Sequence, residues 1–177
     1  MLVQIRARNA TRDEILRFHT VEYHDRIVEE SKQSKGGDGG EQCRFHHGGY
    51  EIALLACGGL LAAVECVLRN QIDNAYCLIR PPGHHAIANK GMGFCIFNNI
   101  ALAAMHAKTL GLNVHKIAIV DYVRNVFPPK RLINNFTEDS DRMFIMAMVR
   151  KKHFGMTRQF SSFRYTKTTT IHKERVP

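Results

Sequence analysis

Two adjacent histidines, His84 and His85, are the residues of this sequence whose type and setting could transfer protons. They directly follow the segment Arg-Pro-Pro-Gly at residues 80–83, where two prolines stop a strand and form a rigid turn. Imidazole titrates close to neutral pH, so it can take up and return a proton during a reaction. An isolated histidine pair most often lies in a solvated loop, so the neighbouring residues decide between the two interpretations.

The surroundings of this pair contain further residues that could form a site. A glycine-rich segment, Gly91 to Cys95, comes shortly afterwards, and Asp121 ends an apolar run. A carboxylate beside an imidazole orients the ring and raises its basicity. Cys95 is equally explained as a small buried hydrophobic residue, and His46 and His47 as solvated side chains.

The helices expected to position these residues begin with two capping signals. Thr11 and Glu14 match a capping box, which predicts a short helix to about Phe18. Thr20 predicts the start of a second helix that runs to about Ser31.

Two longer helices are expected further along the chain, after a loop at residues 34–49. Residues 50–68 are apolar on most sides, which predicts a buried helix. Residues 98–110 predict another apolar helix, and Gly111 ends it.

Two short apolar runs, residues 75–79 and 116–121, predict strands. Strand, helix and strand in this order imply a parallel pair with a right-handed crossover. Ligands of such sheets bind beyond the carboxyl ends of the strands, which is where His84, His85 and Asp121 fall.

Composition favours an intracellular protein of the nucleus or cytoplasm. The five cysteines form no C-x-x-C pair, and arginines interrupt the first residues before any signal-peptide core. The apolar stretch Ile52 to Val64 is shorter than the roughly 20 residues that span a bilayer, so no membrane partner is expected.

Charge divides the chain into two parts. Residues 1–122 carry 13 basic and 12 acidic side chains, whereas residues 123–177 carry 12 basic and 4 acidic ones. A basic tail could bind nucleic acid or another polyanion. The tail shows no helical or strand period, however, so nucleic-acid binding is the weaker interpretation.

The motifs RPPGHHA at residues 80–86 and GFCIFNN at residues 93–99 together resemble the histone deacetylase family, in its class II and acetylpolyamine amidohydrolase-like branch. The similarity also includes the capped helices and the segment from Gly48 to Ala56, and it ends at Tyr122. The resemblance implies an α/β, arginase/deacetylase-like parallel sheet with flanking helices, present only as an N-terminal fragment in residues 1–122.

The resemblance also implies a function and a set of site residues. The family consists of zinc-dependent amidohydrolases, whose substrates are N-acetyl-lysine in proteins or acetylpolyamines. By position, His85 resembles the general base and acid and His84 its electrostatic companion, while Asp121 would hydrogen-bond to His84. Gly93 and Phe94 resemble the walls of the substrate channel, although Phe94 could instead be a core residue.

One further role suggested by the family is an acidic contact at the rim of the channel. Asp38 or Glu41 could supply it, but solvated loop charges are the simpler explanation.

The sequence departs from the family directly after Tyr122. The family strand continues as V-D-x-D-V-H-H-G-N-G-T, in which the second Asp and the first His bind zinc, with another Asp from much later in the chain. Here residues 120–127 read VDYVRNVF. We therefore expect the zinc ligands to be absent and the chain to be inactive and prone to aggregate.

The tail has an explanation in the genetic code. If each codon from Arg142 to Val149 is read from its third base, the shifted codons are compatible with D-V-H-H-G-N-G, the missing family segment. Val123 and Arg124 can be encoded as a splice donor. The hypothesis is that residues 123–141 translate a retained intron and residues 142–177 an exon read out of frame, giving a disordered, non-homologous tail.

Three functional alternatives follow from the sequence. The first is a zinc-dependent deacetylase, with this chain catalytically incomplete. The second is a non-catalytic splice product or interaction fragment. The third and weakest is a polyanion binder that uses the basic tail.

Overall fold

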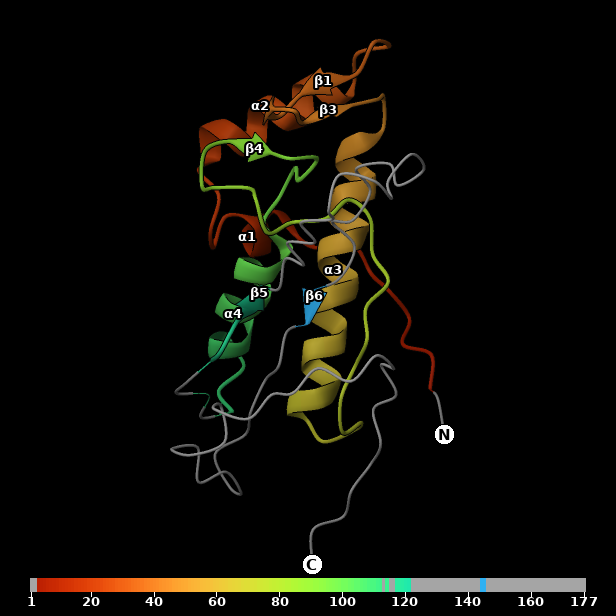
Figure 1. Ribbon diagram of the computed structural model, residues 1–177, viewed down its shortest axis with the longest axis vertical. Coiled ribbons are helices and arrows are strands. Elements are labelled where there is room, and N and C mark those ends of the chain that lie inside the picture. The colour runs from red at the N-terminus through yellow and green to blue at the C-terminus, as the bar shows by residue number, and fades with distance from the viewer. Residues whose placement is uncertain (1–2, 113, 115–116, 122–143, 146–177) are drawn as a thin grey trace, which may run out of the picture.

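The structure is a computed structural model that describes residues 3–112, 114, 117–121 and 144–145 (Figure 1). Helix α3 forms its centre, and α4 lies beside α3. In chain order the elements are α1 (Arg12–Ile15), α2 (Val21–Ser31), β1 (Gly37–Asp38), β2 (Gly40–Glu41), β3 (Arg44–Phe45), α3 (Gly49–Leu68), β4 (Gly91–Met92), α4 (Asn99–Thr109), β5 (Val120–Asp121) and β6 (Phe144–Ile145).

Thr11 and Thr20 start the first two helices as predicted, and Asn98 caps a third. The Thr11 hydroxyl accepts from the Glu14 N–H at 3.2 Å, and the Glu14 carboxylate accepts from the Thr11 N–H at 2.8 Å. Thr20 caps α2 through the Tyr23 N–H at 3.2 Å. Asn98 caps α4 by accepting from the Ala101 N–H at 2.9 Å. Each cap satisfies a backbone donor that the first turn of a helix leaves without an intrahelical partner.

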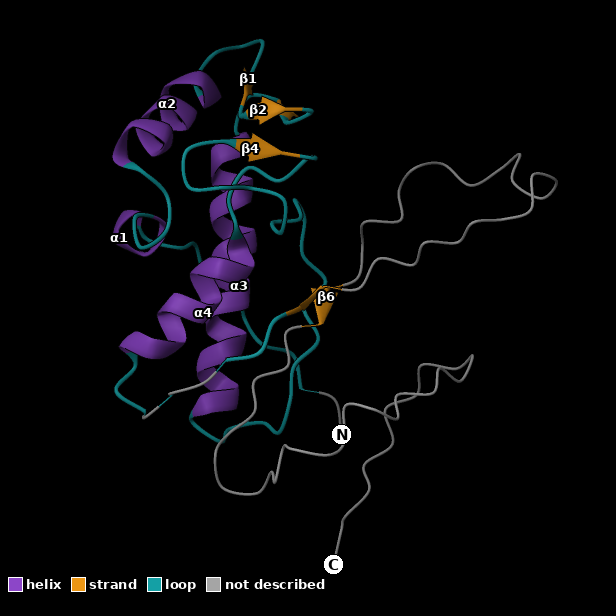
Figure 2. Ribbon diagram, turned by 60° about the vertical axis from the view of Figure 1, so that its left-hand side comes forward, coloured by secondary structure: helices purple, strands orange, loops and turns teal. Residues whose placement is uncertain are grey.

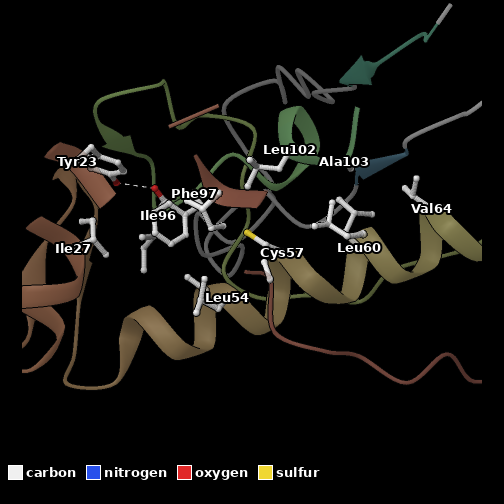
Figure 3. Close-up of a cluster of buried hydrophobic side chains, with 14 of the residues drawn as sticks. Tyr23, Ile27, Leu54, Cys57, Leu60, Val64, Ile96, Phe97, Leu102 and Ala103 are labelled. Carbon is white, nitrogen blue, oxygen red and sulfur yellow. Dashed lines mark hydrogen bonds between the residues drawn. The ribbon is translucent and has the colours of Figure 1, made fainter. Parts of the chain in front are cut away.

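The core lies where α3 and α4 pack against each other and against α2 (Figure 3). Figure 3 shows apolar side chains from these three helices and from residues 96–97 converging on one cluster. The Tyr23 hydroxyl donates to the Ile96 carbonyl at 2.7 Å, so this buried side chain satisfies its polar end within the core. The predicted helices at 50–68 and 98–110 are confirmed, with starts that differ by one residue.

Gly58 lets a chain segment cross directly over α3. A Cβ at this position would lie 2.0 Å from the Arg8 carbonyl oxygen and 2.5 Å from the Ala10 nitrogen. Ala10 also donates its N–H to the Leu54 carbonyl at 2.9 Å. The segment before α1 therefore docks on the α3 backbone, at a distance that only glycine permits.

Helix α3 is long and apolar enough to cross a membrane by length and composition alone. The uncharged stretch Ile52 to Val64, considered in the sequence analysis, is only part of this helix. More than half of the apolar window is buried inside the structure, where it packs against α4 and α2. This arrangement is that of a core helix.

Three two-stranded ladders are present among the described residues. Figure 2 shows β1, β2 and β4 gathered beside α2 near the start of α3. Strands β1 and β3 pair antiparallel, β2 and β4 pair parallel, and β5 and β6 pair antiparallel. The prediction of a plain loop at residues 34–49 is therefore incomplete, because this segment contributes three short strands.

The predicted parallel pair of residues 75–79 and 116–121 is wrong for the part of the chain that the structure describes. Residues 75–79 are not in a ladder, and the strand at Val120–Asp121 pairs with β6. Cys77 and Ile79 pack against the core while Tyr76 and Leu78 are exposed. An apolar run of this length is compatible with a strand, but it does not supply a partner strand.

Most of the tail that the sequence separates from the rest, residues 123–143 and 146–177, lies outside the described residues. The predicted disorder of residues 123–177 therefore stays a prediction. Phe144 and Ile145 belong to that tail and form β6.

Candidate active site

The turn that carries the histidine pair sits directly on the start of α4. A Cβ at Gly83 would lie 2.1 Å from the Asn99 side-chain oxygen, so the backbone approaches α4 at a glycine. The Ala86 N–H donates to the Gly83 carbonyl at 3.3 Å and closes the turn around the pair. The His84 and His85 rings lie 3.7 Å apart between centroids, with His84 half-buried and His85 exposed.

The structure brings one of the two predicted channel residues, Gly93, to this pair. Gly93 has φ +49°, and a Cβ there would lie 2.6 Å from Cδ2 of His85. The Gly93 backbone is therefore in contact with the His85 ring. Phe94 has φ +64° and is 57% exposed, so the alternative of a core residue is wrong for Phe94.

The segment 34–49 holds the channel loop in place. Gly93 donates its N–H to the Glu41 carbonyl and Phe94 to the Gln42 carbonyl, each at 2.9 Å. The Cys43 thiol, fully buried, contacts the Cys95 carbonyl at 3.2 Å. Cys95 is itself fully buried, which confirms the interpretation as a small hydrophobic residue.

The charged residues of this segment are solvated. The Glu41 carboxylate pairs with Lys90 at 3.2 Å, and Asp38 accepts from the Gly40 N–H at 3.0 Å. His46 and His47 are exposed, as expected of solvated side chains. The role of an acidic rim contact stays a prediction.

His19 is a site residue that sequence reasoning missed. It is 3% exposed, its Nε2 accepts from the Asn98 N–H at 2.9 Å, and its Nδ1 lies 3.1 Å from the Ala88 carbonyl. Because Nε2 is the acceptor, a neutral ring carries its proton on Nδ1 and donates it to Ala88. Burial lowers the pKa of His19 to about 4, which keeps the ring neutral near pH 7.

Asn98 connects α4 to the histidine turn. Its side-chain amide donates to the Ala86 carbonyl at 2.8 Å while its oxygen caps α4. Asn98 belongs to the family-like motif, but the motif gives no indication of this contact. The partners of Asn98 and His19 could not be found from the sequence because they lie 12 and 69–79 residues away.

Asp121 lies exposed in β5, where it pairs with Phe144. This position is at the end of the apolar run, as the sequence suggests. The hydrogen bond from Asp121 to His84 that the resemblance implies stays a prediction.

The described residues contain one group of three that could hold a metal by distance, and it is not at the histidine pair. Its members are Glu14, Glu65 and His106, at the junction of α1, α3 and α4. Arg8 makes two hydrogen bonds of 2.7 Å to Glu14 and one of 3.1 Å to Glu65. His106 bonds Glu65 at 2.7 Å.

This group is an ion-pair cluster. The Arg8 guanidinium holds the pKa of Glu14 at about 2, so the carboxylate is charged and already compensated. A cation would have to displace Arg8 from both carboxylates. Around His84 and His85, the described side chains do not form a set that fits the zinc ion of the family.

Comparison with known proteins places the chain in context. The histone deacetylase domain matches residues 1–122. A histone deacetylase-like amidohydrolase of Pseudomonas aeruginosa is 41% identical over 113 residues, which are 64% of this chain and 29% of that protein. The polyamine deacetylase HDAC10 of Danio rerio is 39% identical over 124 residues, 65% of this chain and 18% of that protein.

Structural similarity agrees with these matches. The crystal structure of the HDA15 HD domain has a TM-score of 0.58 and 31% identity, and the match covers 62% of this chain and 31% of that one. The chain thus spans less than a third of the length of these relatives. The predicted fold class, an N-terminal part of a deacetylase-like α/β fold, is confirmed, and the chain belongs to the histone deacetylase family.

Proposed function

We propose that this chain carries the proton-transfer and channel-lining part of a deacetylase active site. The substrate would be the acetyl amide of N-acetyl-lysine in a protein or of an acetylpolyamine. The observation that carries the proposal is the contact between the His85 ring and the Gly93 backbone; the next residue, Phe94, is exposed.

The chemistry assigns a role to each residue. Hydrolysis of an amide breaks a C–N bond, so water must lose a proton and the departing amine must gain one. His85 is exposed and can serve both transfers, first as base and then as acid. The His84 ring restricts the orientation of His85, and Phe94 would lie along the methylene stem of the substrate.

We propose further that the chain is catalytically incomplete by itself. Zinc supplies the family with a polarised carbonyl and an activated water, and the described residues near His85 do not fit that ion. A general acid–base group contributes about 10²–10⁴-fold. Enzymes reach at least about 10⁶-fold, so the histidines do not replace the missing contribution.

The test is to measure bound zinc and turnover of acetyl-lysine peptide and acetylpolyamine with the purified 177-residue protein. We expect less than stoichiometric zinc and no turnover above the background rate. Equimolar zinc with turnover that His85→Ala abolishes would support the assignment of His85 but contradict the incompleteness.

The origin of the tail is a separate proposal. We propose that residues 123–141 derive from a retained intron and 142–177 from an exon read out of frame, so that the product is a non-catalytic splice form or interaction fragment. The support is the departure from the family motif after Tyr122 and the shifted-frame match. Sequencing of the transcript and the locus tests it, and an uninterrupted exon across codon 122 refutes it.

The compartment and partners follow from the same proposal. An acetylated protein or acetylpolyamine of the nucleus or cytoplasm is the expected substrate of the complete site. None of the five cysteines, all of them among the described residues, forms a disulfide, which supports a reducing compartment.

A further inference from the structure

The loop from the histidine turn to α4, residues 86–98, is held by buried polar side chains at the start of α2. His19 bonds the loop at Ala88 and Asn98, and Tyr23 bonds it at Ile96. His19 and Tyr23 are four residues apart and their rings lie 5.4 Å apart. The loop that carries Gly93 and Phe94 is therefore anchored on both sides of these residues.

The contacts of His19 continue to the catalytic turn. His19 fixes the backbone of Asn98, and the Asn98 side chain donates to Ala86, the residue after His85. Ala86 in turn closes the turn onto Gly83. Two hydrogen bonds thus link the His19 ring to the backbone beside His85.

We propose that His19 is a positioning residue for His85. Its neutral ring, which accepts from Asn98 and donates to Ala88, fixes the turn that holds His85 against Gly93. This inference rests on the proposed function, because the position of His85 matters only if His85 transfers protons.

The surroundings of His19 fix the ring in one orientation. Its centroid lies 4.9 Å from the Phe18 ring and 5.1 Å from the Phe97 ring. Burial keeps the pKa of the ring well below its usual value, so Nε2 stays available as an acceptor. A plain core position would hold an apolar side chain, whereas this one satisfies backbone groups on either side of the channel loop.

The two bonds of His19 are not equivalent. The Ala88 carbonyl also accepts from the Thr20 N–H at 3.0 Å, so it retains a donor when His19 is replaced. The Asn98 N–H depends on Nε2 of His19. A glutamine can place an acceptor near the position of Nε2, whereas an asparagine is too short to do so. The acceptor should therefore decide which variants preserve the site.

The experiment uses nuclear magnetic resonance of the 177-residue protein labelled at histidine and glycine. The signal is the Overhauser contact between Hδ2 of His85 and Hα of Gly93, read for the wild type, His19→Gln, His19→Leu and His19→Asn. His24→Gln is the matched control, because His24 is also buried on α2 but bonds Asp25 and Tyr50.

We expect the contact to persist in the wild type, His19→Gln and His24→Gln, and to be lost in His19→Leu and His19→Asn. Persistence of the contact in His19→Leu, or its loss in His24→Gln, overturns the proposal. If His19→Leu does not fold, the comparison of His19→Gln with His19→Asn decides, and equal effects of the two overturn it.

The same spectra separate this inference from the proposed function. The wild-type His19 ring should show a proton on Nδ1, none on Nε2, and no titration between pH 8 and 5; any other state overturns the positioning role. These signals report geometry and do not depend on turnover. If the chain never hydrolyses an acetyl amide, the proposed function fails while the link from His19 to His85 is still measured.

Discussion

Two histidine-containing clusters in this molecule have opposite surroundings. At His106, ion pairs among Arg8, Glu14 and Glu65 satisfy the charges within the cluster, and the histidine is 5% exposed. At the second cluster, His85 is exposed and lies against the backbone of a glycine. The first arrangement joins three helices, whereas the second presents an imidazole to solvent.

Burial and charge compensation thus distinguish the ion-pair cluster from the cluster that we propose to be reactive. Two carboxylates and a histidine lie within metal-ligand distance of one another at His106, yet Arg8 already hydrogen-bonds to both carboxylates. His85, in contrast, is exposed and contacts the Gly93 backbone. Substitutions should therefore affect stability at the first cluster and geometry at the second.

The largest expected effect is that of Glu14→Ala on stability. This carboxylate closes the capping box of α1 and binds Arg8 in a bidentate pair. Loss of a cap costs about 1 kcal/mol. Loss of a buried ion pair costs about 3–5 kcal/mol, less here because Arg8 is partly exposed and can be hydrated. We expect a decrease of about 3 kcal/mol in the free energy of unfolding, measured by urea denaturation.

The control for this substitution is Glu29→Ala, which removes an exposed pair with Lys32. It should change the free energy of unfolding by less than about 0.5 kcal/mol. Equal effects of the two substitutions would show that the cluster at Glu14 is not the joint between the helices.

The pH dependence of the free energy of unfolding distinguishes the contribution of His19 from that of Glu14. The pKa of His19 is about 4 in the folded chain, against 6.5 ordinarily, so the unfolded chain binds a proton between these values that the folded chain does not. The contribution of His19 is present above about pH 6.5 and is lost as the pH falls toward 4, by up to about 3 kcal/mol. The nearby His24 ring also lowers the pKa of His19.

Glu14 responds at lower pH, because its pKa falls from 4.5 to about 2 on folding. Its contribution is present above about pH 4.5 and is lost toward pH 2. Denaturation at pH 7, 5 and 4 should therefore show a slope that His19→Gln removes and Glu14→Gln does not. An unchanged slope in His19→Gln would contradict the neutral, buried state of His19.

A smaller effect is expected of Gly93→Ala, which tests the reactive cluster. The positive φ of this residue costs a side chain about 1–2 kcal/mol, and the new methyl group would meet the His85 ring. The histidine ring is exposed and can move aside, so the main result should be loss of the Overhauser contact between residues 85 and 93. Gly111→Ala is the control, because it has a similar φ and open space around its Cβ.

If Gly93→Ala and Gly111→Ala cost the same and the His85 resonances do not move in either, the close approach of Gly93 has no role in placing the ring. If His85 moves more in Gly93→Ala than in Gly111→Ala, the contact of the new methyl group displaces the ring, and the backbone strain common to both variants does not.

The helices could be predicted from the sequence because their signals are local. Thr11, Thr20 and Asn98 each cap a helix through a backbone N–H three residues away, so a short window contains both partners. The apolar character of α3 likewise indicates burial. The start of α4 and the end at Gly111 follow from the same local rules.

The ladders could not be predicted, because pairing depends on residues far apart in the chain. Gly40 pairs with Gly91 and Asp121 with Phe144, over two residues each, and such short ladders have no periodic pattern. The apolar run at residues 75–79 predicted a strand, but the structure shows no ladder there. Local periodicity contains no information about the partner.

The motifs name candidate site residues, whose roles stay predictions, but they do not indicate which residues support them. The motifs indicated His84, His85, Gly93 and Phe94, and the structure brings His85 and Gly93 together. Nothing near His19 in the sequence indicates that its ring bonds residues 88 and 98. A buried histidine is identified as a support only when both of its nitrogen partners are known.

The smallest expected effect is that of His85→Asn, and a matched substitution makes it informative. An exposed side chain outside the core changes the free energy of unfolding by no more than about 0.5 kcal/mol. His106→Asn removes the same ring from a buried position where it bonds Glu65, and a hydrogen bond to a charged group contributes about 1.5–3 kcal/mol. Urea denaturation of both variants side by side gives the difference directly. If His85→Asn costs as much as His106→Asn, His85 is held for structure, and the distinction between the two clusters fails. If only His106→Asn destabilises the chain, the imidazole at residue 85 contributes nothing to folding and is available for chemistry.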